Sequence, residues 1–160
     1  MTNIIRDWNP AEGQAFQGDV SIIPVPASVK LTLTDQISPV GNLLILQEGE
    51  TTGHHHAIGL TDRNVPDAIN AQVERLMVDA LSGRIPLPSA KLYRDPRAAE
   101  QMRGLGILTR TDLIVGLLIV EVGPMVLRHQ EHDGIRIPPG VYLIGRQIES
   151  AGAEERMVRD

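Results

Sequence analysis

Short hydrophobic segments, separated by glycine, proline and polar residues, run through most of the chain and predict β-strands. The clearest alternation covers residues 29–34, where Val29, Leu31 and Leu33 are separated by polar residues, as on a half-buried strand. The end of the chain, residues 154–160, is either a final edge strand or a tail. Further strands are expected over residues 17–25, 43–47, 54–60, 113–122, 125–131, 135–137 and 141–149.

The pattern becomes helical between about residues 61 and 111. Asp95 followed by Pro96 predicts a short helix that ends near Gly104, because aspartate caps helices and proline suits their first turn. A longer helix is expected over residues 66–81, where apolar residues recur at the spacing of one helix face. The middle of the chain is therefore expected to be a two-helix insertion. The apolar positions of the longer helix are Ile69, Val73, Leu76, Met77 and Ala80.

Together these elements predict a single, mainly β domain over residues 1–160. Roughly eight or nine short strands with glycine and proline turns are typical of a small barrel or a sandwich, and both architectures stay open at this point. A chain of 160 residues with 42% hydrophobic content is long enough to bury a core. Because aromatic residues make up only 2%, that core must consist of Leu, Ile, Val and Ala.

Charge and residue types narrow the function. The net charge of −5 argues against duplex nucleic acid, which requires many Lys and Arg contacts to phosphates. Without cysteine, any metal must be bound by imidazole and carboxylate. The longest apolar run, residues 113–122, is about half as long as a membrane-spanning helix. Residues 1–14 lack the apolar stretch of a signal peptide. We expect a cytoplasmic protein, or a virion-associated one if phage-derived, with no membrane partner. A small-molecule or protein partner and a homo-oligomer stay open.

All five histidines fall into two short clusters about 75 residues apart. Residues 54–56 are three consecutive histidines, and His129 and His132 follow on a later segment. Histidine is the commonest metal ligand and the usual acid or base at neutral pH. A chain that places all its histidines at two points is expected to bring those points together.

Strand alternation selects the members of this candidate site. If the first cluster is extended, His54 and His56 share one face and His55 points away. If the later strand continues far enough, His129 and Glu131 share a face as well. Three imidazoles and a carboxylate suit a divalent metal, with zinc as the first choice. The predicted metal ligands are His54, His56, His129 and Glu131.

Glu131 and His132 are the candidates for acid–base catalysis. His132 lies at the mouth of a predicted hairpin, where it could act as an acid or base or replace Glu131 as a ligand. The alternatives are a metal-free acid–base or anion site, and a structural role for the whole cluster. The latter is common, because many histidines in proteins are simply hydrogen-bonded.

Several segments together resemble a family of small uncharacterised bacterial and phage-type proteins. Their pattern is a QGDV start, a GE-x-TGH-x-H segment, an H-x-EH segment with a Pro-Gly turn and a tyrosine strand, and an RQ-x-E ending. The matching residues are Gln17–Val20, Glu48–His56, Leu127–Glu149 and Met157–Asp160. The resemblance implies site positions, with His55 at a variable one, and no reaction. These positions are His54, His56, His129, Glu131 and His132, with Gln147 and Glu149 behind them.

The histidine pair on an early strand also resembles cupins, which bind a metal inside a small barrel. The carboxylate that cupins carry after this pair is missing here, since residues 57–61 contain no glutamate. The cupin likeness is therefore one of architecture alone.

Two functions follow from these observations. The first is a histidine-cluster metal-binding protein, such as a metal-dependent hydrolase or another metalloenzyme, in which the metal keeps an open position for water. The second is a non-enzymatic phage or prophage accessory protein, with a structural or assembly role, in which the histidines stabilise the fold or an interface. Whether the protein is an enzyme is not decided by the sequence. A metal or pH sensor is a third reading, without a DNA-reading element to support it.

Overall fold

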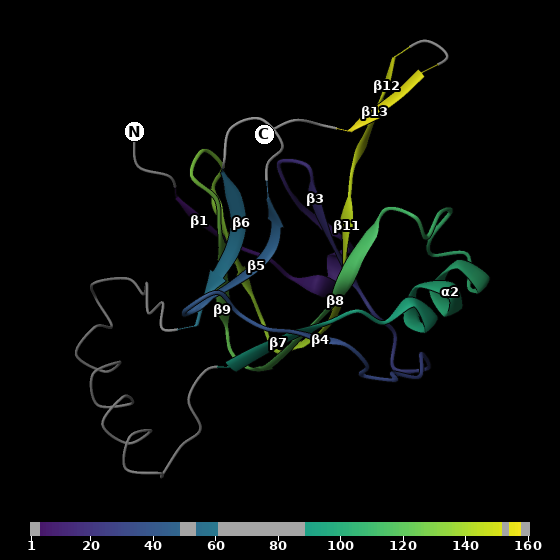
Figure 1. Cartoon of the computed structure of the whole chain (residues 1–160), viewed down its shortest axis with the longest axis horizontal. Coiled ribbons are helices and arrows are strands. Elements are labelled where there is room, and N and C mark those ends of the chain that lie inside the picture. The colour runs from purple at the N-terminus through teal and green to yellow at the C-terminus, as the bar shows by residue number, and fades with distance from the viewer. Residues whose placement is uncertain (1–3, 49–53, 61–88, 152–153, 158–160) are drawn as a thin grey trace.

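Two β-sheets form the body of the protein (Figure 1). The computed structural model describes residues 4–48, 54–60, 89–151 and 154–157. The first sheet has the strand order β1-β10-β9-β6-β5, with β1 (Ile5–Asp7), β5 (Leu43–Glu48), β6 (His55–Gly59), β9 (Met125–Arg128) and β10 (Gly134–Ile137). The second has the order β2-β3-β11-β8-β7-β4, with β2 (Ala15–Gln17), β3 (Val20–Pro24), β4 (Gln36–Ile37), β7 (Ser89–Tyr93), β8 (Ile114–Val122) and β11 (Gly140–Arg146).

The remaining elements lie outside these sheets. They are the 3-10 turn η1 (Pro10–Glu12), the helix α2 (Pro96–Gly104), and a separate two-stranded ribbon of β12 (Ile148–Ala151) and β13 (Glu154–Met157). Figure 1 shows the ribbon as an extension of β11 that projects away from both sheets. None of the described helices is long and apolar enough to cross a membrane.

The prediction of a mainly β fold is confirmed, and the arrangement is sandwich-like. In the described residues neither sheet closes on itself: β1 and β5 are the edges of the first sheet, and β2 and β4 are the edges of the second. The barrel alternative is therefore not the fold. The described strands number thirteen rather than eight or nine, because several are only two or three residues long.

The main core lies between the two sheets and draws on nearly every strand. Residues from the first sheet, such as Leu46, Ile58 and Leu127, are buried against residues from the second, such as Ile22 and Leu118. Burying one such side chain contributes about 1.5–3 kcal/mol. Leucine, isoleucine and valine dominate this core, as the low aromatic content predicts.

A second core covers the other face of the six-stranded sheet. Leu117 on β8 and Leu143 on β11 pack there against Met102 of α2. Strand β8 is thus covered on both faces, which explains why residues 113–122 form a continuous apolar run instead of an alternating one.

Helix α2 begins and ends where the sequence predicts. Asp95 is its N-cap, Pro96 occupies the first turn, and the helix ends at Gly104. The other predicted helix, residues 66–81, lies outside the described residues, so the two-helix insertion is not confirmed. Residues 89–93 form strand β7, so the predicted insertion also contains β-structure.

Residues 29–34 do not form a strand, although their sequence alternates. Val29 is buried, but Leu33 is 45% exposed and has a φ of 51°, outside the extended region. The Thr32 N–H donates to the Asp95 carboxylate at 2.9 Å instead of to a neighbouring strand. The alternation therefore belongs to a loop that is anchored to the start of α2.

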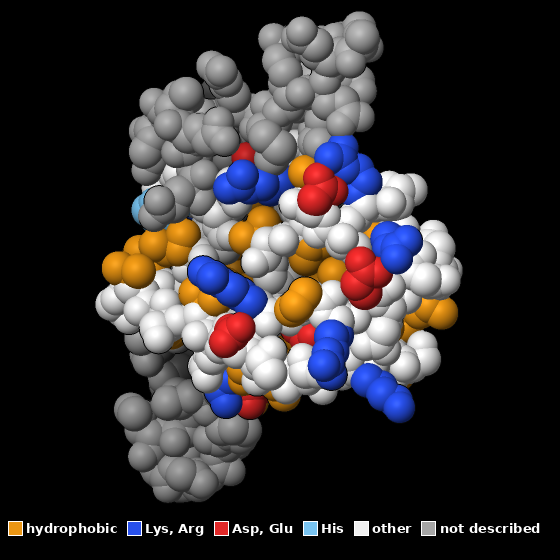
Figure 2. Space-filling view, turned by 45° about the vertical axis from the view of Figure 1, so that its right-hand side comes forward, with side chains coloured by type: hydrophobic (Ala, Val, Ile, Leu, Met, Phe, Trp, Pro, Cys, Tyr) orange, Lys and Arg blue, Asp and Glu red, His pale blue; other side chains and the backbone are white. Residues whose placement is uncertain are grey.

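Exposed charges of both signs alternate on the surface shown in Figure 2, and no continuous basic stripe crosses that face. The exposed ion pairs of the protein include Arg103 with Glu100 at 2.8 Å and Lys91 with Glu121 at 3.3 Å. Such pairs contribute only about 0–1 kcal/mol each.

Tyr142 offers a first test of the core. It is 2% exposed, its hydroxyl donates to the Pro138 carbonyl oxygen at 2.7 Å, and its ring lies 5.3 Å from that of Trp8. Burial raises the pKa of the hydroxyl to about 12. We expect Tyr142→Phe to lower the free energy of unfolding by about 1 kcal/mol, measured by urea denaturation, because it removes one hydrogen bond and keeps the ring. An unchanged midpoint would show that this bond does not stabilise the fold.

Candidate functional site

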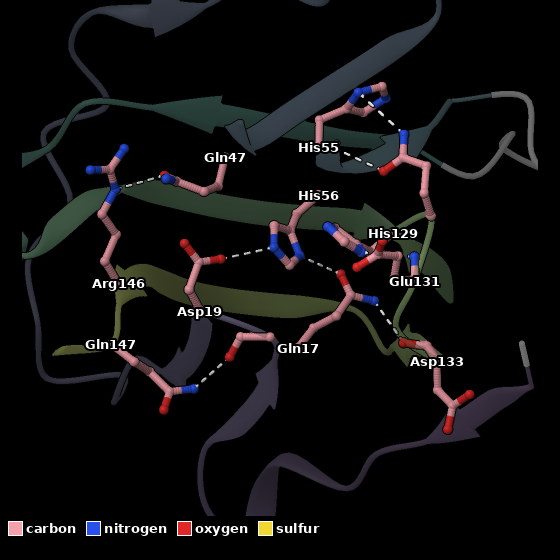
Figure 3. A network of polar contacts seen from close by, with 12 residues as sticks. Gln17, Asp19, Gln47, His55, His56, His129, Glu131, Asp133, Arg146 and Gln147 are labelled. Carbon is pink, nitrogen blue, oxygen red and sulfur yellow. Dashed lines mark hydrogen bonds and ion pairs between the residues drawn. The ribbon is translucent and has the colours of Figure 1, made fainter. Parts of the chain in front are cut away.

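His56 links the two sheets through both nitrogens of its ring (Figure 3). It lies on β6 of the first sheet and has no exposed surface. Its Nδ1 is 2.8 Å from Gln17 Oε1, and its Nε2 is 3.0 Å from Asp19 Oδ1. Gln17 ends β2 in the second sheet, Asp19 immediately precedes β3, and both are buried. We call these three residues the cross-sheet triad.

The bonds of Gln17 determine where the protons of the triad lie. Gln17 Nε2 donates to the carbonyl oxygens of Leu127 at 3.0 Å and Asp133 at 2.8 Å, so Oε1 is the atom that faces His56. His56 Nδ1 must therefore carry a proton and donate it. A second proton lies between His56 Nε2 and the Asp19 carboxyl group. Whichever atom holds that proton, the buried pair has no net charge, which avoids the larger cost of burying an unpaired charge.

The turn that carries Asp19 is held in place by Gln147. Gly18 has a φ of 54°, a conformation that glycine adopts without steric cost. The Gln147 N–H donates to the Asp19 carbonyl oxygen at 2.8 Å, and Gln147 Nε2 donates to the Gly18 carbonyl oxygen at 3.0 Å. The QGDV and RQ segments therefore form one structural unit that supports His56.

Three more imidazoles surround His56. The His129 ring centroid lies 4.3 Å from that of His56 and 5.5 Å from that of His54. The His132 ring centroid lies 4.5 Å from that of His129 and 6.1 Å from that of His56. The structure thus brings four of the five histidines into one cluster at the end of the sandwich, and the two sequence clusters meet there.

Glu131 is placed differently from the prediction. Strand β9 ends at Arg128, so His129 and Glu131 lie in the loop that precedes β10 and not on a strand face. The Glu131 N–H donates to His129 Nδ1 at 3.0 Å. Its carboxylate is 3.5 Å from His54 Nδ1, and the Glu131 side chain is 55% exposed. Glu131 therefore orients His129 through its backbone and meets His54 at the rim of the cluster.

Two of the four predicted metal ligands, His56 and His129, use ring nitrogens for hydrogen bonds in this arrangement. A histidine ligand offers one unprotonated nitrogen to the metal and carries its proton on the other. Both nitrogens of His56 are engaged by Gln17 and Asp19. Because His129 Nδ1 accepts a hydrogen bond, a neutral His129 carries its proton on Nε2. In the described part of the chain no group of three or more His, Asp or Glu side chains is arranged to hold a metal ion.

Arg146 and Gln47 form a second polar link between the sheets. Arg146 ends β11 in the second sheet, and its Nε donates to Gln47 Oε1 on β5 of the first sheet at 2.8 Å. Arg146 is half-buried beside the triad (Figure 3). The two cross-sheet links lie close to each other at the histidine end of the sandwich.

His55 lies apart from the other histidines, as alternation predicts. It faces the opposite side of β6, where its N–H donates to Gln130 Oε1 at 2.9 Å. Gln17 and Asp19 are the site residues that the sequence pattern did not single out. Two polar side chains on either side of a glycine, directly before a buried strand, are the signal that could have found them.

Comparison of the chain with protein-family models, curated proteins and solved structures found no match. The function must therefore be inferred from the geometry of the side chains.

Proposed function

We propose that the chain is a non-enzymatic structural or interaction module in which the histidine cluster stabilises the fold. The observation that carries this proposal is the cross-sheet triad, where both nitrogens of the most buried histidine are bonded to the opposite sheet. A residue used in this way holds the two sheets together.

The geometry of His56 is poorly suited to acid–base catalysis. A general base must direct an unprotonated nitrogen toward the proton that it removes. In catalytic triads the carboxylate holds one nitrogen of the histidine and the other faces the nucleophile. Here the second nitrogen of His56 faces the Gln17 amide oxygen, which is not a nucleophile. The pairing of Asp19 with His56 is therefore better explained as structural.

The ribbon of β12 and β13 supports an interaction role. Among the described residues, β12 and β13 pair only with each other, in the register Ile148 to Met157 through Ala151 to Glu154, and form their own sheet. An isolated two-stranded ribbon is marginally stable in water. Contact with another molecule would supply the stabilisation that the two larger sheets do not provide.

Metal dependence of stability distinguishes this proposal from the metalloprotein reading. We expect a chelator to leave the Tm of the untagged protein unchanged within about 1 °C, and added zinc to raise it by no more than that. Zinc at a hundred times its dissociation constant would stabilise a folded site by about 2.7 kcal/mol, which corresponds to a rise of roughly 5–10 °C.

The variants His54→Ala and Glu131→Gln complete the test, because both residues lie at the rim and outside the triad. A rise of several degrees with zinc that disappears in these variants would overturn the proposal and restore the metal site. Equal behaviour of the parent and both variants with zinc and with chelator supports the structural role.

A further inference from the structure

A groove of about 680 Å³ lies between helix α2 and the loop that precedes β4. Residues 30–32 of the loop line one side of it, and the first two turns of α2 line the other. The volume lies within the range of small-ligand sites, about 300–1,000 Å³. This depression is called the loop–helix groove below.

The side-chain amide of Gln101 holds the two sides of the loop–helix groove together. Gln101 Oε1 accepts the Lys30 N–H at 2.9 Å, and Gln101 Nε2 donates to the Lys30 carbonyl oxygen at 2.8 Å. The same Nε2 donates to the Arg97 carbonyl oxygen, one helical turn earlier, at 3.2 Å. Residues four positions apart lie on one helix face. Lys30 is therefore attached to the face of α2 that carries Arg97.

Lys30 and Arg97 bring two positive charges to the groove that the protein itself does not pair. Within the described ranges, neither the Lys30 ammonium group nor the Arg97 guanidinium forms a hydrogen bond or an ion pair. Glu100 also lines the groove, but its Oε2 accepts Nε and Nη2 of Arg103 at 3.0 and 2.8 Å. The charge of Glu100 is thus directed to Arg103, and the two cations face the groove without a counter-charge of their own.

Apolar side chains adjoin these two cations. Leu31 packs partly against the second core, Pro96 occupies the first turn of α2, and both line the groove. A ligand in the groove therefore contacts hydrocarbon as well as charge. Each methylene group that is fully buried strengthens binding about fourfold, so a ligand with an apolar part gains over a compact ion.

We propose that the loop–helix groove binds a small carboxylate that carries a short apolar chain. The carboxylate lies between Lys30 and Arg97, and the apolar chain lies over Leu31 and Pro96. Arginine binds a carboxylate through two parallel hydrogen bonds, and lysine adds a point charge. This binding activity goes beyond the proposed structural role and does not depend on it, because none of the three triad residues lines the groove.

The test titrates the full-length protein with acetate and with hexanoate at neutral pH and constant ionic strength, each to about 50 mM. NMR follows the side-chain amide signals of Gln101. We expect saturable shifts, with a dissociation constant on the order of 1 mM for hexanoate. Hexanoate should bind about fourfold or more tightly than acetate, because its longer chain reaches the apolar side chains. A linear shift, or equal affinity for the two carboxylates, would overturn the proposal.

Two further probes distinguish the chemistry of the ligand. Hexanamide has the same chain without the charge, so it should not saturate the shifts of Gln101. Inorganic phosphate has the charge without the chain, so it should bind more weakly than hexanoate. Binding of hexanamide as tight as that of hexanoate would show that the cations play no part. Tighter binding of phosphate would show a site for a compact ion, and either result contradicts the proposal.

Matched variants separate the groove from general charge effects. Arg97→Gln should weaken hexanoate binding about tenfold, and Arg97→Lys should weaken it less. Lys91→Gln is the control, because it removes one positive charge from β7 outside the groove and should leave binding unchanged. Leu31→Ala should reduce the preference for hexanoate over acetate. Equal weakening by Lys91→Gln and Arg97→Gln would also overturn the proposal. Because none of these variants alters the triad, their outcome does not depend on that of the proposed function.

Discussion

Replacing His56 with leucine is expected to lower the free energy of unfolding by about 3–5 kcal/mol, the largest effect of any single substitution proposed for this protein. The volume of the side chain is nearly preserved, so the loss comes from polar groups and not from a cavity. Urea denaturation at neutral pH measures it, with the m-value checked against the parent so that the change reflects stability alone.

The size of this effect follows from what the substitution leaves behind. Asp19 is 4% exposed and Gln17 is 1% exposed, so neither can turn to water when its partner is removed. A buried carboxyl group without its partner loses its hydrogen bond and keeps its desolvation cost. Gln17 in turn is fixed by its bonds to the carbonyl oxygens of Leu127 and Asp133, so its Oε1 cannot find another donor by rotation.

His55→Leu is the matched control, since it makes the same change one position earlier and on the other face of β6. His55 is half-buried and keeps its backbone bond to Gln130 in this variant, so we expect a loss within about 1 kcal/mol. A double-mutant cycle with Asp19→Leu adds the decisive measurement. The double variant should cost less than the sum of the two single variants by about 1–3 kcal/mol. Additive losses would show that His56 and Asp19 do not stabilise each other.

Those parts of the fold that depend on local sequence could be predicted. The Asp95-Pro96 pair placed the start of α2, because capping is decided within one helical turn. The apolar run over residues 113–122 identified β8, because a strand covered on both faces needs apolar residues at every position. Alternation alone separated His55 from His54 and His56, since it follows from the geometry of any extended chain.

Those parts of the fold that depend on residues far away in the sequence could not be predicted. The loop over residues 29–34 has the pattern of a strand, but its hydrogen bonds go to a carboxylate about 60 positions later in the chain. Strands of two or three residues, such as β1 and β4, exist because a neighbouring strand supplies their bonds, and their own sequences carry almost no signal.

The histidine site was likewise predictable only in part. The sequence predicted that the two clusters meet, but it could not show that His56 would be bonded on both nitrogens. That outcome depends on the turn at Gly18, which directs Gln17 and Asp19 toward the opposite sheet. Residue type and spacing suggest what a histidine could bind, whereas its hydrogen-bond partners decide which of its nitrogens is available.

Asp95→Ala is expected to lower the free energy of unfolding by about 2–4 kcal/mol. The Asp95 carboxylate attaches the loop preceding β4 to the start of α2, and a second attachment joins Lys30 to Gln101 farther along the helix. The carboxylate accepts the Ala98 N–H of the first helical turn at 3.2 Å, the Thr32 N–H and hydroxyl at 2.9 Å each, and the Leu33 N–H at 3.4 Å. Alanine would leave all of these donors without their acceptor at a position that is 3% exposed.

The conformation of the attached loop adds to this effect. Leu33 and Asp35 both adopt positive φ, at 51° and 55°, which costs roughly 1–2 kcal/mol for a residue other than glycine. The bonds to Asp95 offset that cost in the folded protein. Asp112→Ala is the matched control, because this carboxylate is paired with Arg110 at the exposed surface, and we expect a loss of no more than about 1 kcal/mol.

The pH dependence of stability, compared between the parent and Asp95→Ala, tests whether the ionised Asp95 carboxylate causes the loss of stability. Burial acts to raise the pKa of Asp95, but the bonds from Thr32, Ala98 and Leu33 together outweigh it and hold the pKa below the ordinary value of 3.8. A carboxyl group whose pKa is lowered by folding stabilises the protein above its unfolded pKa, and this stabilisation is lost as the pH falls through the folded pKa.

The difference in stability between the parent and Asp95→Ala should therefore be constant between roughly pH 6 and 8 and shrink below about pH 4. Urea denaturation at a series of pH values measures it. Asp95→Asn should retain part of the stability, because its amide oxygen still caps α2, and should lose the acid dependence that belongs to the carboxylate. A difference between the parent and Asp95→Ala that stays constant to pH 3 would show that packing, and not the ionised carboxylate, holds the loop to the helix.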